Sequence, residues 1–368
     1  MTAIPCLTHQ RLEQLLAAFP QRRIALIGDL FLDRYLELLD VHELSIETGL
    51  EAFQVASIRN APGALGTVMN NLAALGVGWL IPVTVIGDDG HGYDLRRSLN
   101  AMPVDDTYLL SDPERMTPTY TKPLRPVGAG VWTELNRLDV RTRAPLSPAT
   151  CERLRASLRQ AWAECEGMIV MDQVAEPGCG VVNDEIRAEL MELAAADPGK
   201  LLIADSRGCL HRFERGALKG NRAEIVRADA ALAGAAPPSP AEDPSDDDLS
   251  AALERFRALG RSVFCTDGER GIHVVTGLAS DGSNEPIRLA PGRRVDGPVD
   301  IVGAGDTVTA ALTAALLSGA DPLEAAALAN LAASISVQKL GETGVATPAE
   351  LRESWIPVEP TISNLSQK

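Results

Sequence analysis

The sequence predicts a three-layer α/β/α protein with a mostly parallel central sheet, helices on both faces of that sheet, and a small second β-sheet. Three observations support this fold class. Short apolar runs alternate with helical patterns along most of the chain, two β-rich stretches break the alternation, and the composition is that of a globular protein, with 45% hydrophobic and 23% charged residues. The 368 residues are enough for one large domain or about two smaller ones.

The predicted strands and helices follow one another along the chain. Apolar runs predict buried strands at 23–28, 80–86, 168–172, 201–205, 262–266 and 272–275, and helical patterns occupy 11–19, 70–75, 151–165, 184–195, the segment after 306, and 322–340. Ligands of such sheets bind at the carboxyl ends of the strands. The aspartates at or just past these ends therefore mark the expected binding edge: Asp29, Asp172, Asp205 and Asp267.

Two stretches, about 36–58 and 117–139, are rich in alternating and β-branched residues and lack helical periodicity. They predict strands of a small separate sheet that serves as a lid. Its exposed strand edges and apolar face predict a homodimer that pairs through the lid. The main domain is expected over residues 22–357, with a helical extension over 1–21 and a C-terminal tail over 358–368.

The charge balance restricts the expected partners. With 34 basic and 50 acidic residues the formal charge is −16, and such a surface repels phosphate backbones and anionic lipids. The sequence therefore predicts no nucleic-acid partner and no membrane partner, and it contains no apolar stretch long enough to span a bilayer. Six scattered cysteines and the lack of an N-terminal apolar segment predict buried free thiols in a cytoplasmic protein.

The strongest local signal is the turn from Asp300 to Asp306, which leads directly into an Ala/Leu-rich helix. The amides of Gly303, Ala304, Gly305 and Asp306 are expected to be unpaired donors at a helix N-terminus, which forms an anion site without a basic side chain. A carboxylate in such a site suits a general base beside a transferring phosphoryl group. Alternatively, Asp306 only caps the helix.

Other motifs allow a functional and a purely structural interpretation. Asn221-Arg-Ala-Glu224 is a functional motif or a turn, and the loop 63–66 either admits a ligand or only joins a loop to a helix. Residues 266–271 by themselves indicate a hairpin, and Asn330 lines a pocket or faces solvent. The five histidines lack zinc-site spacing, and neither a P-loop nor a G-x-G-x-x-G motif follows the first strand.

The order of these motifs resembles that of the PfkB (ribokinase-like) carbohydrate kinase family. G-D-x-x-x-D occurs at 28–33, a glycine-containing loop near 63, N-x-x-E at 221–224 and D-x-x-G-A-G-D at 300–306, so the resemblance covers about residues 22–352. Within the family the chain looks most like the D-glycero-β-D-manno-heptose 7-phosphate kinases, through the stretches 28–35, 44–47, 119–122, 136–139 and 329–341. The resemblance implies a ribokinase-like fold.

The resemblance also implies ATP-dependent phosphorylation of a sugar or sugar phosphate, with Mg²⁺ as cofactor. It makes Asp306 the base that deprotonates the acceptor hydroxyl, with Gly303, Ala304 and Gly305 as the anion hole. The implied substrate-binding residues are Asp29, Asp33, Gly63, Thr67 and Lys122. The implied nucleotide-binding residues are Asn221, Glu224, Thr266, Gly268, Gly271 and Asn330, with Glu224 holding Mg²⁺ through water and Asp300 near a monovalent cation such as K⁺.

Three positions depart from the family pattern. Relatives have a Gly pair followed three residues later by Asn, whereas this chain has Gly63-Ala64 and Thr67, and Val302 replaces a usual Thr. These departures predict intact phosphoryl-transfer machinery with an altered readout of the sugar hydroxyls. They also motivate an alternative, a non-catalytic sugar- or nucleotide-binding regulatory protein on a kinase scaffold, against which the presence of Asp306 and Glu224 argues.

Overall fold

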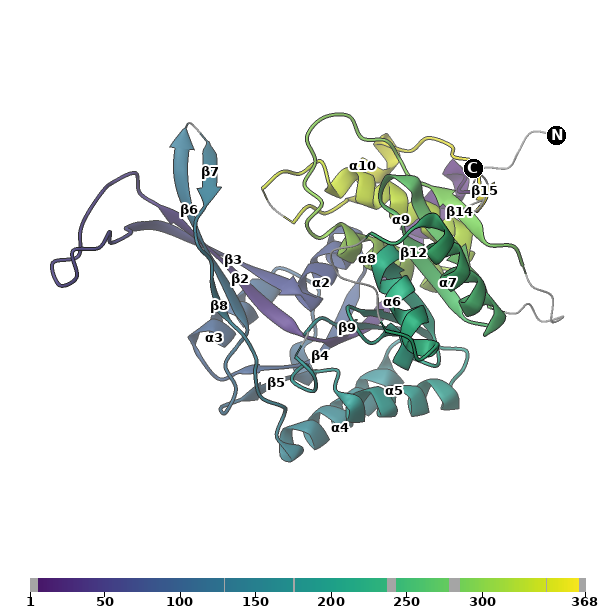
Figure 1. Ribbon diagram of the computed structural model, residues 1–368, viewed down its shortest axis with the longest axis horizontal. Coiled ribbons are helices and arrows are strands. Elements are labelled where there is room, and N and C mark those ends of the chain that lie inside the picture. Colours follow the sequence, from purple (N-terminus) through teal and green to yellow (C-terminus); the bar gives the residue numbers. More distant parts are fainter. Residues whose placement is uncertain are drawn as a thin grey trace.

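A computed structural model describes residues 6–128, 130–174, 176–236, 243–277, 285–341 and 343–363. These residues form a helix-covered main body around a ten-stranded sheet, and a smaller sheet extends from one side of that body (Figure 1). The strand order of the main sheet is β15-β14-β13-β12-β11-β10-β9-β1-β4-β5. The smaller sheet has the order β3-β2-β6-β7, with β8 paired to β6, and we call it the lid.

The strands of the main sheet are β1 (Arg23–Gly28), β4 (Trp79–Gly87), β5 (Leu109–Asp112), β9 (Gly167–Asp172), β10 (Leu201–Ser206), β11 (Ala217–Asn221), β12 (Ser262–Thr266), β13 (Gly271–Val275), β14 (Arg288–Pro291) and β15 (Thr361–Ile362). The lid strands are β2 (Leu30–Leu38), β3 (Val55–Ala64), β6 (Thr119–Gly128), β7 (Val131–Glu134) and β8 (Leu138–Val140). The α-helices are α1 (His9–Ala18), α2 (Leu65–Ala74), α3 (Gly90–Leu99), α4 (Pro148–Glu164), α5 (Asp184–Ala196), α6 (Arg222–Leu232), α7 (Asp246–Ala258), α8 (Ala304–Leu317), α9 (Pro322–Ser336) and α10 (Pro348–Glu353).

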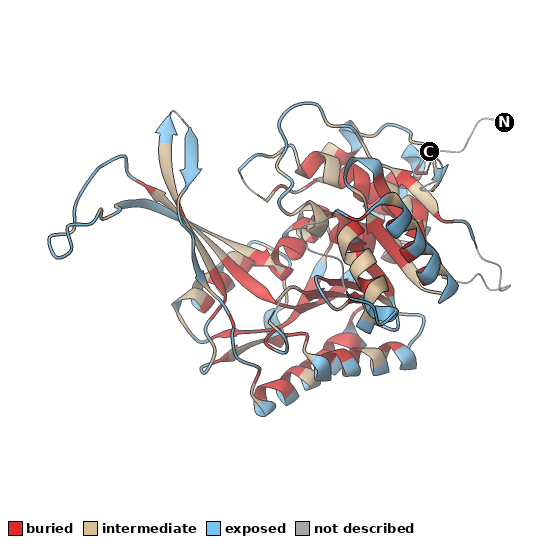
Figure 2. Ribbon diagram, in the orientation of Figure 1, coloured by how far each residue is buried: buried red, intermediate tan, exposed pale blue. Residues whose placement is uncertain are grey.

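The main sheet is parallel from β5 to β12 and antiparallel from β12 to β15. Alternate residues of β1 enter two different cores. Ile24 and Leu26 belong to the core under α1, α2, α8 and α9, whereas Ala25 and Ile27 belong to the core under α4, α5, α6 and α7. Figure 2 shows the buried strands between these two helical layers. The predicted α/β fold with a mostly parallel sheet is confirmed.

Helix α9 begins as the sequence predicts and ends earlier. Asp321 caps it in a reciprocal capping box with Glu324, and Pro322 occupies the first turn. The predicted end near residue 340 is wrong, because the helix stops at Ser336. The Val337 carbonyl accepts the Asp300 amide at 2.8 Å, which brings the chain beyond α9 against the turn that precedes α8.

The smaller sheet exists as predicted, but its strand boundaries differ. Strand β2 begins at Leu30, directly after β1, and β3 runs to Ala64, so the lid strands reach deep into the body. Residues 39–54 between them form no strand beyond a single bridge from Leu44 to Glu51. Their alternating apolar pattern was therefore a misleading strand signal, because this long connection has no neighbouring strand to pair with among the described residues (Figure 1).

The described segments nearest the two ends of the chain pack against the main body. In the predicted extension 1–21, Leu12 and Leu15 of α1 are fully buried in the core shared with α8 and α9. In the predicted tail 358–368, β15 pairs with β14, and residues 364–368 lie outside the described part. All six cysteines are free thiols, and no helix in the described ranges is long and apolar enough to cross a bilayer.

Candidate active site

The first turn of α8 lies at the carboxyl-terminal edge of the main sheet. Its N-cap is Gly303, whose φ of +81° is a left-handed conformation that favours glycine, and a Cβ there would clash with Thr343. No side chain caps this turn. The interpretation of Asp306 as the helix cap is therefore wrong, because Asp306 lies at the third position within the helix.

The backbone amides of this turn form a small anion site. The Ala304 amide donates to the Ile301 carbonyl at 3.1 Å, so it is occupied in this conformation. The amides of Gly305 and Asp306 are at helical positions that have no carbonyl partner within the helix. They remain available to an anion and lie at the positive end of the helix dipole.

A buried ion pair supports this turn from the sheet side. Lys219 on β11 contacts Asp205 on β10 at 2.8 Å, and Thr309 donates to the same Asp205 oxygen at 2.9 Å. Lys219 and Asp205 are 5% and 4% exposed. A methyl group on Gly305 would lie 3.0 Å from the Lys219 Nζ, so the ammonium group is close to the backbone of the anion site.

Asp306 is partly buried among charged groups. Burial, with the negative charge of Asp205 as the next cause, raises its pKa to about 7, and the positive charges of Lys219 and Arg207 oppose that rise. Burial and Asp205 also raise the pKa of Glu224 above its usual range. A carboxyl group with a pKa near neutrality holds and releases a proton readily, as a general base requires.

The predicted nucleotide-binding residues follow two neighbouring strands. Asn221 ends β11 and pairs in register with Thr266, which ends β12. Asn221 is also the N-cap of α6 and forms a capping box with Glu224. The motif therefore starts a helix, which the interpretation as a turn does not include. Thr266 donates to the Gly220 carbonyl at 3.4 Å.

The hairpin interpretation of residues 266–271 is confirmed, because β12 and β13 are antiparallel. Gly268 and Gly271 have φ values of +54° and +113°, and a Cβ on Gly271 would clash with the Ala290 carbonyl. Asn330 is 8% exposed and donates to the carbonyls of Ala290 and Pro291 at 2.8 and 3.1 Å. The solvent-facing interpretation of Asn330 is therefore wrong.

Three predicted substrate-binding residues meet at the inner end of the lid. Lys122 on β6 contacts Asp33 on β2 at 2.8 Å and donates to the Tyr35 hydroxyl at 3.3 Å. Gly63 on β3 faces Asp33 so closely that a Cβ would clash with its carboxylate. The lid thus places an acid and a base together on the strands that lead into the body.

The departures from the family pattern lie between the lid and α8. Ala64 has a φ of +52°, which costs a residue with a Cβ about 1 kcal/mol or more. Thr67 is 6% exposed, and its methyl group would lie 3.5 Å from a Cβ on Gly303. Asn71 donates to the Thr67 carbonyl and accepts from Thr307, both at 2.9 Å, and so ties α2 to α8.

Two other predicted site residues hold backbone segments. Asp29 is 2% exposed, and its carboxylate accepts the amides of Val181, Gln173 and Val174 at 2.7, 3.2 and 3.3 Å. Burial raises its pKa to about 6. Asp300 accepts the amides of Val302 and Gly341 at 3.0 and 3.3 Å. Direct contacts of Asp29 with a sugar and of Asp300 with a cation stay predictions.

Sequence reasoning missed Lys219 and Arg207 and gave Asp205 no role beyond its place at a strand end. Lys219 interrupts an otherwise apolar run two residues before Asn221. A lone lysine within a buried strand is uncommon unless a carboxylate pairs with it, so that position was the available signal. Arg207 gave no signal, because it follows β10 in a loop.

The N-terminus of α8 has no side-chain cap, contains an acid in its first turn and lies at the carboxyl edge of a parallel sheet, beneath a β lid. This arrangement defines a group-transfer site for anionic substrates. The chain belongs to the PfkB carbohydrate kinase family. The model of the pfkB family carbohydrate kinases matches residues 207–349.

Curated relatives and solved structures agree with this assignment. The chain is 30% identical to the bifunctional protein HldE of Rhodopseudomonas palustris (strain BisB5) over 94% of its own length and 66% of that protein, and 32% identical to HldE of Acidiphilium cryptum over 91% and 63%. It therefore spans just under two thirds of these relatives.

Solved structures show the ribokinase-like fold. Escherichia coli phosphofructokinase-2 in complex with potassium has a TM-score of 0.63 at 19% identity, with 90% of this chain and 97% of that one covered. Arabidopsis thaliana ribokinase complexed with ribose and ATP has a TM-score of 0.59 at 18% identity, with 90% and 98% covered.

We predict that Asp205→Ala lowers the free energy of unfolding by about 3–5 kcal/mol, because it leaves the Lys219 ammonium buried without a partner. The double variant Asp205→Leu/Lys219→Met recovers most of that loss, since no buried charge remains. Urea unfolding measures both. Glu254→Ala, which breaks an exposed ion pair with Arg257, serves as the control and changes stability by about 1 kcal/mol or less. Equal losses in Asp205→Ala and Glu254→Ala would contradict the buried-pair account.

Proposed function

We propose that this protein transfers the γ-phosphoryl group of ATP to a hydroxyl group of a sugar or sugar phosphate. The observation that carries the proposal is the half-buried Asp306 carboxyl group, with a pKa of about 7, in a helix turn whose Gly305 and Asp306 amides are free for an anion. A binding protein has no evident need for a carboxylate there, because the carboxylate repels the anion that the amides attract.

The transfer step uses groups of this chain. The Asp306 carboxylate accepts the proton of the acceptor hydroxyl, whose oxygen forms a bond to the γ-phosphorus. The bond from that phosphorus to the β–γ bridging oxygen breaks, and ADP leaves with the electron pair. The amides of Gly305 and Asp306, with the nearby Lys219 ammonium, stabilise the negative charge on the transferring group.

The residues present are compatible with Mg²⁺ that is held mainly by phosphates and water. No group of three His, Cys, Asp or Glu side chains in the described ranges could form a protein-only metal site. Mg²⁺ commonly keeps several waters and uses one or two carboxylates. Glu224 uses one oxygen for the Asn221 amide at 2.8 Å, which leaves the other for such a water. When bound, Mg²⁺ neutralises phosphate charge.

The acceptor is best sought among heptose phosphates, with D-glycero-β-D-manno-heptose 7-phosphate as the first candidate. The support is the bifunctional HldE relatives and the motif stretches on the lid, which include Asp33 and Lys122. A monovalent cation such as K⁺ beside Asp300 also belongs to this proposal. Asp300 ties the turn before α8 to the segment after α9, so a cation there would stabilise both.

We predict that Asp306→Asn lowers the rate of sugar-dependent ADP release by about 10²–10⁴-fold, because asparagine cannot accept the proton. The rate is measured with ATP, Mg²⁺ and a panel of sugars and heptose phosphates. Asp296→Asn, at a position whose side chain is 89% exposed, is the matched control. Wild-type turnover by Asp306→Asn would refute its role, and binding without turnover by the wild-type protein on every sugar would favour the regulatory alternative.

The proposal includes a homodimer that forms through the lid. Large apolar side chains of the lid and of its 39–54 connection are exposed, with Ile46 at 103%, Leu50 at 70% and Leu138 at 66%. In Figure 2 the ribbon of the 39–54 connection, at the end of the lid far from the main body, has mostly the colour of exposed residues. A second copy of the lid would cover these side chains and pair the exposed strand edges.

We predict a dimer mass for the wild-type chain at micromolar concentration in sedimentation equilibrium. The double variant Ile46→Asp/Leu50→Asp is expected to be a monomer, because each substitution would place a carboxylate in an apolar interface. Leu259→Asp, at a 54% exposed position beyond α7 on the main body, is the control and stays dimeric. A monomeric wild-type chain would exclude the dimer.

A further inference from the structure

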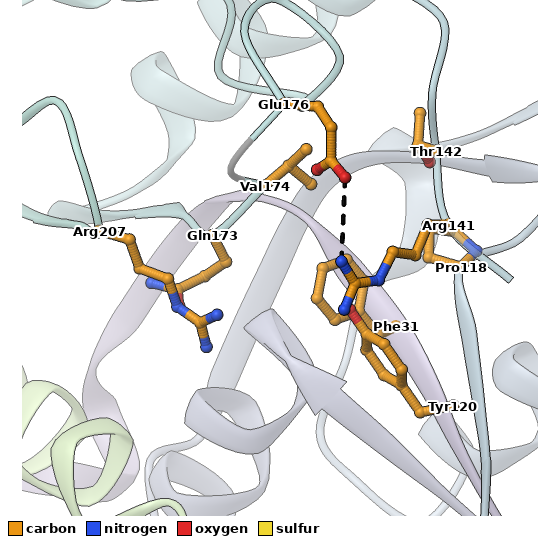
Figure 3. A pocket seen from close by; sticks show the side chains of 9 residues that line it. All are labelled: Phe31, Pro118, Tyr120, Arg141, Thr142, Gln173, Val174, Glu176 and Arg207. Atoms are coloured by element: carbon orange, nitrogen blue, oxygen red, sulfur yellow. Dashed lines mark hydrogen bonds and ion pairs between the residues drawn. The ribbon is translucent and has the colours of Figure 1, made fainter. Parts of the chain in front are cut away.

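A cavity lies between the lid and the main body, beside the group-transfer site. Its volume is about 410 Å³ when the space open to solvent is included, and Figure 3 shows the side chains that line it. The lid contributes Phe31, Pro118 and Tyr120, and the loops after β8, β9 and β10 contribute Arg141, Thr142, Gln173, Val174, Glu176 and Arg207. None of the residues to which sequence reasoning assigned a role lines this cavity.

Positive charge exceeds negative charge in this lining. The lining contains two arginines, Arg141 and Arg207, and a single acid, Glu176. The contacts of Arg141 are long: its guanidinium lies 3.9 Å from the Glu176 carboxylate and 3.4 Å from the Asp139 carboxylate. Asp139 is bound more closely by Arg137, at 2.6 and 2.9 Å. The guanidinium of Arg141 can therefore bind an incoming anion without breaking a strong contact.

Arg207 has no carboxylate partner in the part of the chain that the structure describes. Its Nε donates to the Gln173 side chain at 2.8 Å, which fixes the base of the guanidinium and leaves both Nη groups available. Figure 3 shows the guanidinium extending away from that loop. An arginine held in this way presents donors in the fork geometry that suits phosphate or carboxylate.

Thr142 provides an independent observation that points to a ligand in this cavity. The residue is 8% exposed, and its hydroxyl is buried without a hydrogen-bond partner among the described residues. A buried hydroxyl without a partner is unfavourable. An anion in the cavity would accept a hydrogen bond from this hydroxyl and remove the penalty.

The cavity is within reach of a substrate that is bound at Asp306. Its lining includes residues just after β9 and β10, and Glu224, whose charge acts on Asp306, follows β11, the next strand. Three adjacent strands span about 10 Å. Arg207 belongs to both regions, because it lines the cavity and its charge acts on Asp306 and Glu224.

We propose that this cavity is the subsite for an anionic substituent of the acceptor sugar, which Arg141, Arg207 and Thr142 bind while the reacting hydroxyl is at Asp306. This inference rests on the proposed kinase function and deepens it. The substituent is a phosphate ester or a carboxylate, since both accept hydrogen bonds from a guanidinium and a hydroxyl. The subsite makes an anionic sugar a better acceptor than the corresponding neutral sugar.

The test compares three forms of each acceptor: the free sugar, its terminal phosphate ester and its terminal carboxylate. Wild-type protein is expected to favour one anionic form over the free sugar by at least about 10-fold in kcat/KM. Arg141→Gln is expected to lower that preference at least about 10-fold, through KM and with little change in kcat, and Thr142→Val to lower it less. The favoured form, phosphate or carboxylate, identifies the substituent.

Arg143→Gln is the matched control, because Arg143 is exposed in the same loop and does not line the cavity; it leaves the preference unchanged. Equal use of free and anionic sugars, or an unchanged preference in Arg141→Gln, would overturn the proposal. If no acceptor supports ADP release, the kinase proposal fails, and calorimetric titration with the same phosphorylated sugars tests the subsite alone. Weaker binding to Arg141→Gln than to wild type then supports the subsite, and equal or absent binding refutes it.

Discussion

The start of α8 is fixed by buried contacts on two sides, and the rest of the site depends on its first turn. From the sheet, the Lys219–Asp205 ion pair contacts the helix through Thr309, and from α2, Asn71 accepts a hydrogen bond from Thr307. The left-handed Gly303 lets the chain enter the helix without a side-chain cap. The Gly305 and Asp306 amides have no carbonyl partner within the helix and remain donors for a phosphoryl group, and burial gives Asp306 a pKa suited to proton transfer.

The lid and the main body contribute complementary chemistry. The body supplies the anion site and the carboxylates around Asp306, whereas the lid contributes the Asp33–Lys122 pair and the aromatic side chains of Phe31 and Tyr120. Strand β2 follows β1 directly, so the lid starts from an interior strand of the main sheet and not from an edge strand. This connection explains how one substrate can contact lid strands and the reacting turn together, and why the cavity beside Arg207 lies where the two parts meet.

The sequence predicted the elements whose signals are local. Strand and helix alternation, the capping box at Asp321 and the turn into α8 all depend on residues near one another in the chain, and the structure contains each of them. The sequence-based prediction failed where contacts between distant segments determine the local structure. The 39–54 connection has strand-like periodicity but no strand to pair with, and Asn330 is buried because β14 supplies carbonyl acceptors for it. The Lys219–Asp205 pair joins two strands, so its partners were invisible in either segment alone.

The pH dependence of kcat/KM tests most directly whether Asp306 acts as a base in this turn. A single carboxylate that must be unprotonated makes kcat/KM fall about tenfold per pH unit below its pKa and become constant above it. Because burial raises the pKa of Asp306 to about 7, the account predicts that the change of slope occurs near neutrality. A profile that is flat down to about pH 5, where a carboxyl group with an ordinary pKa is still ionised, would contradict the account.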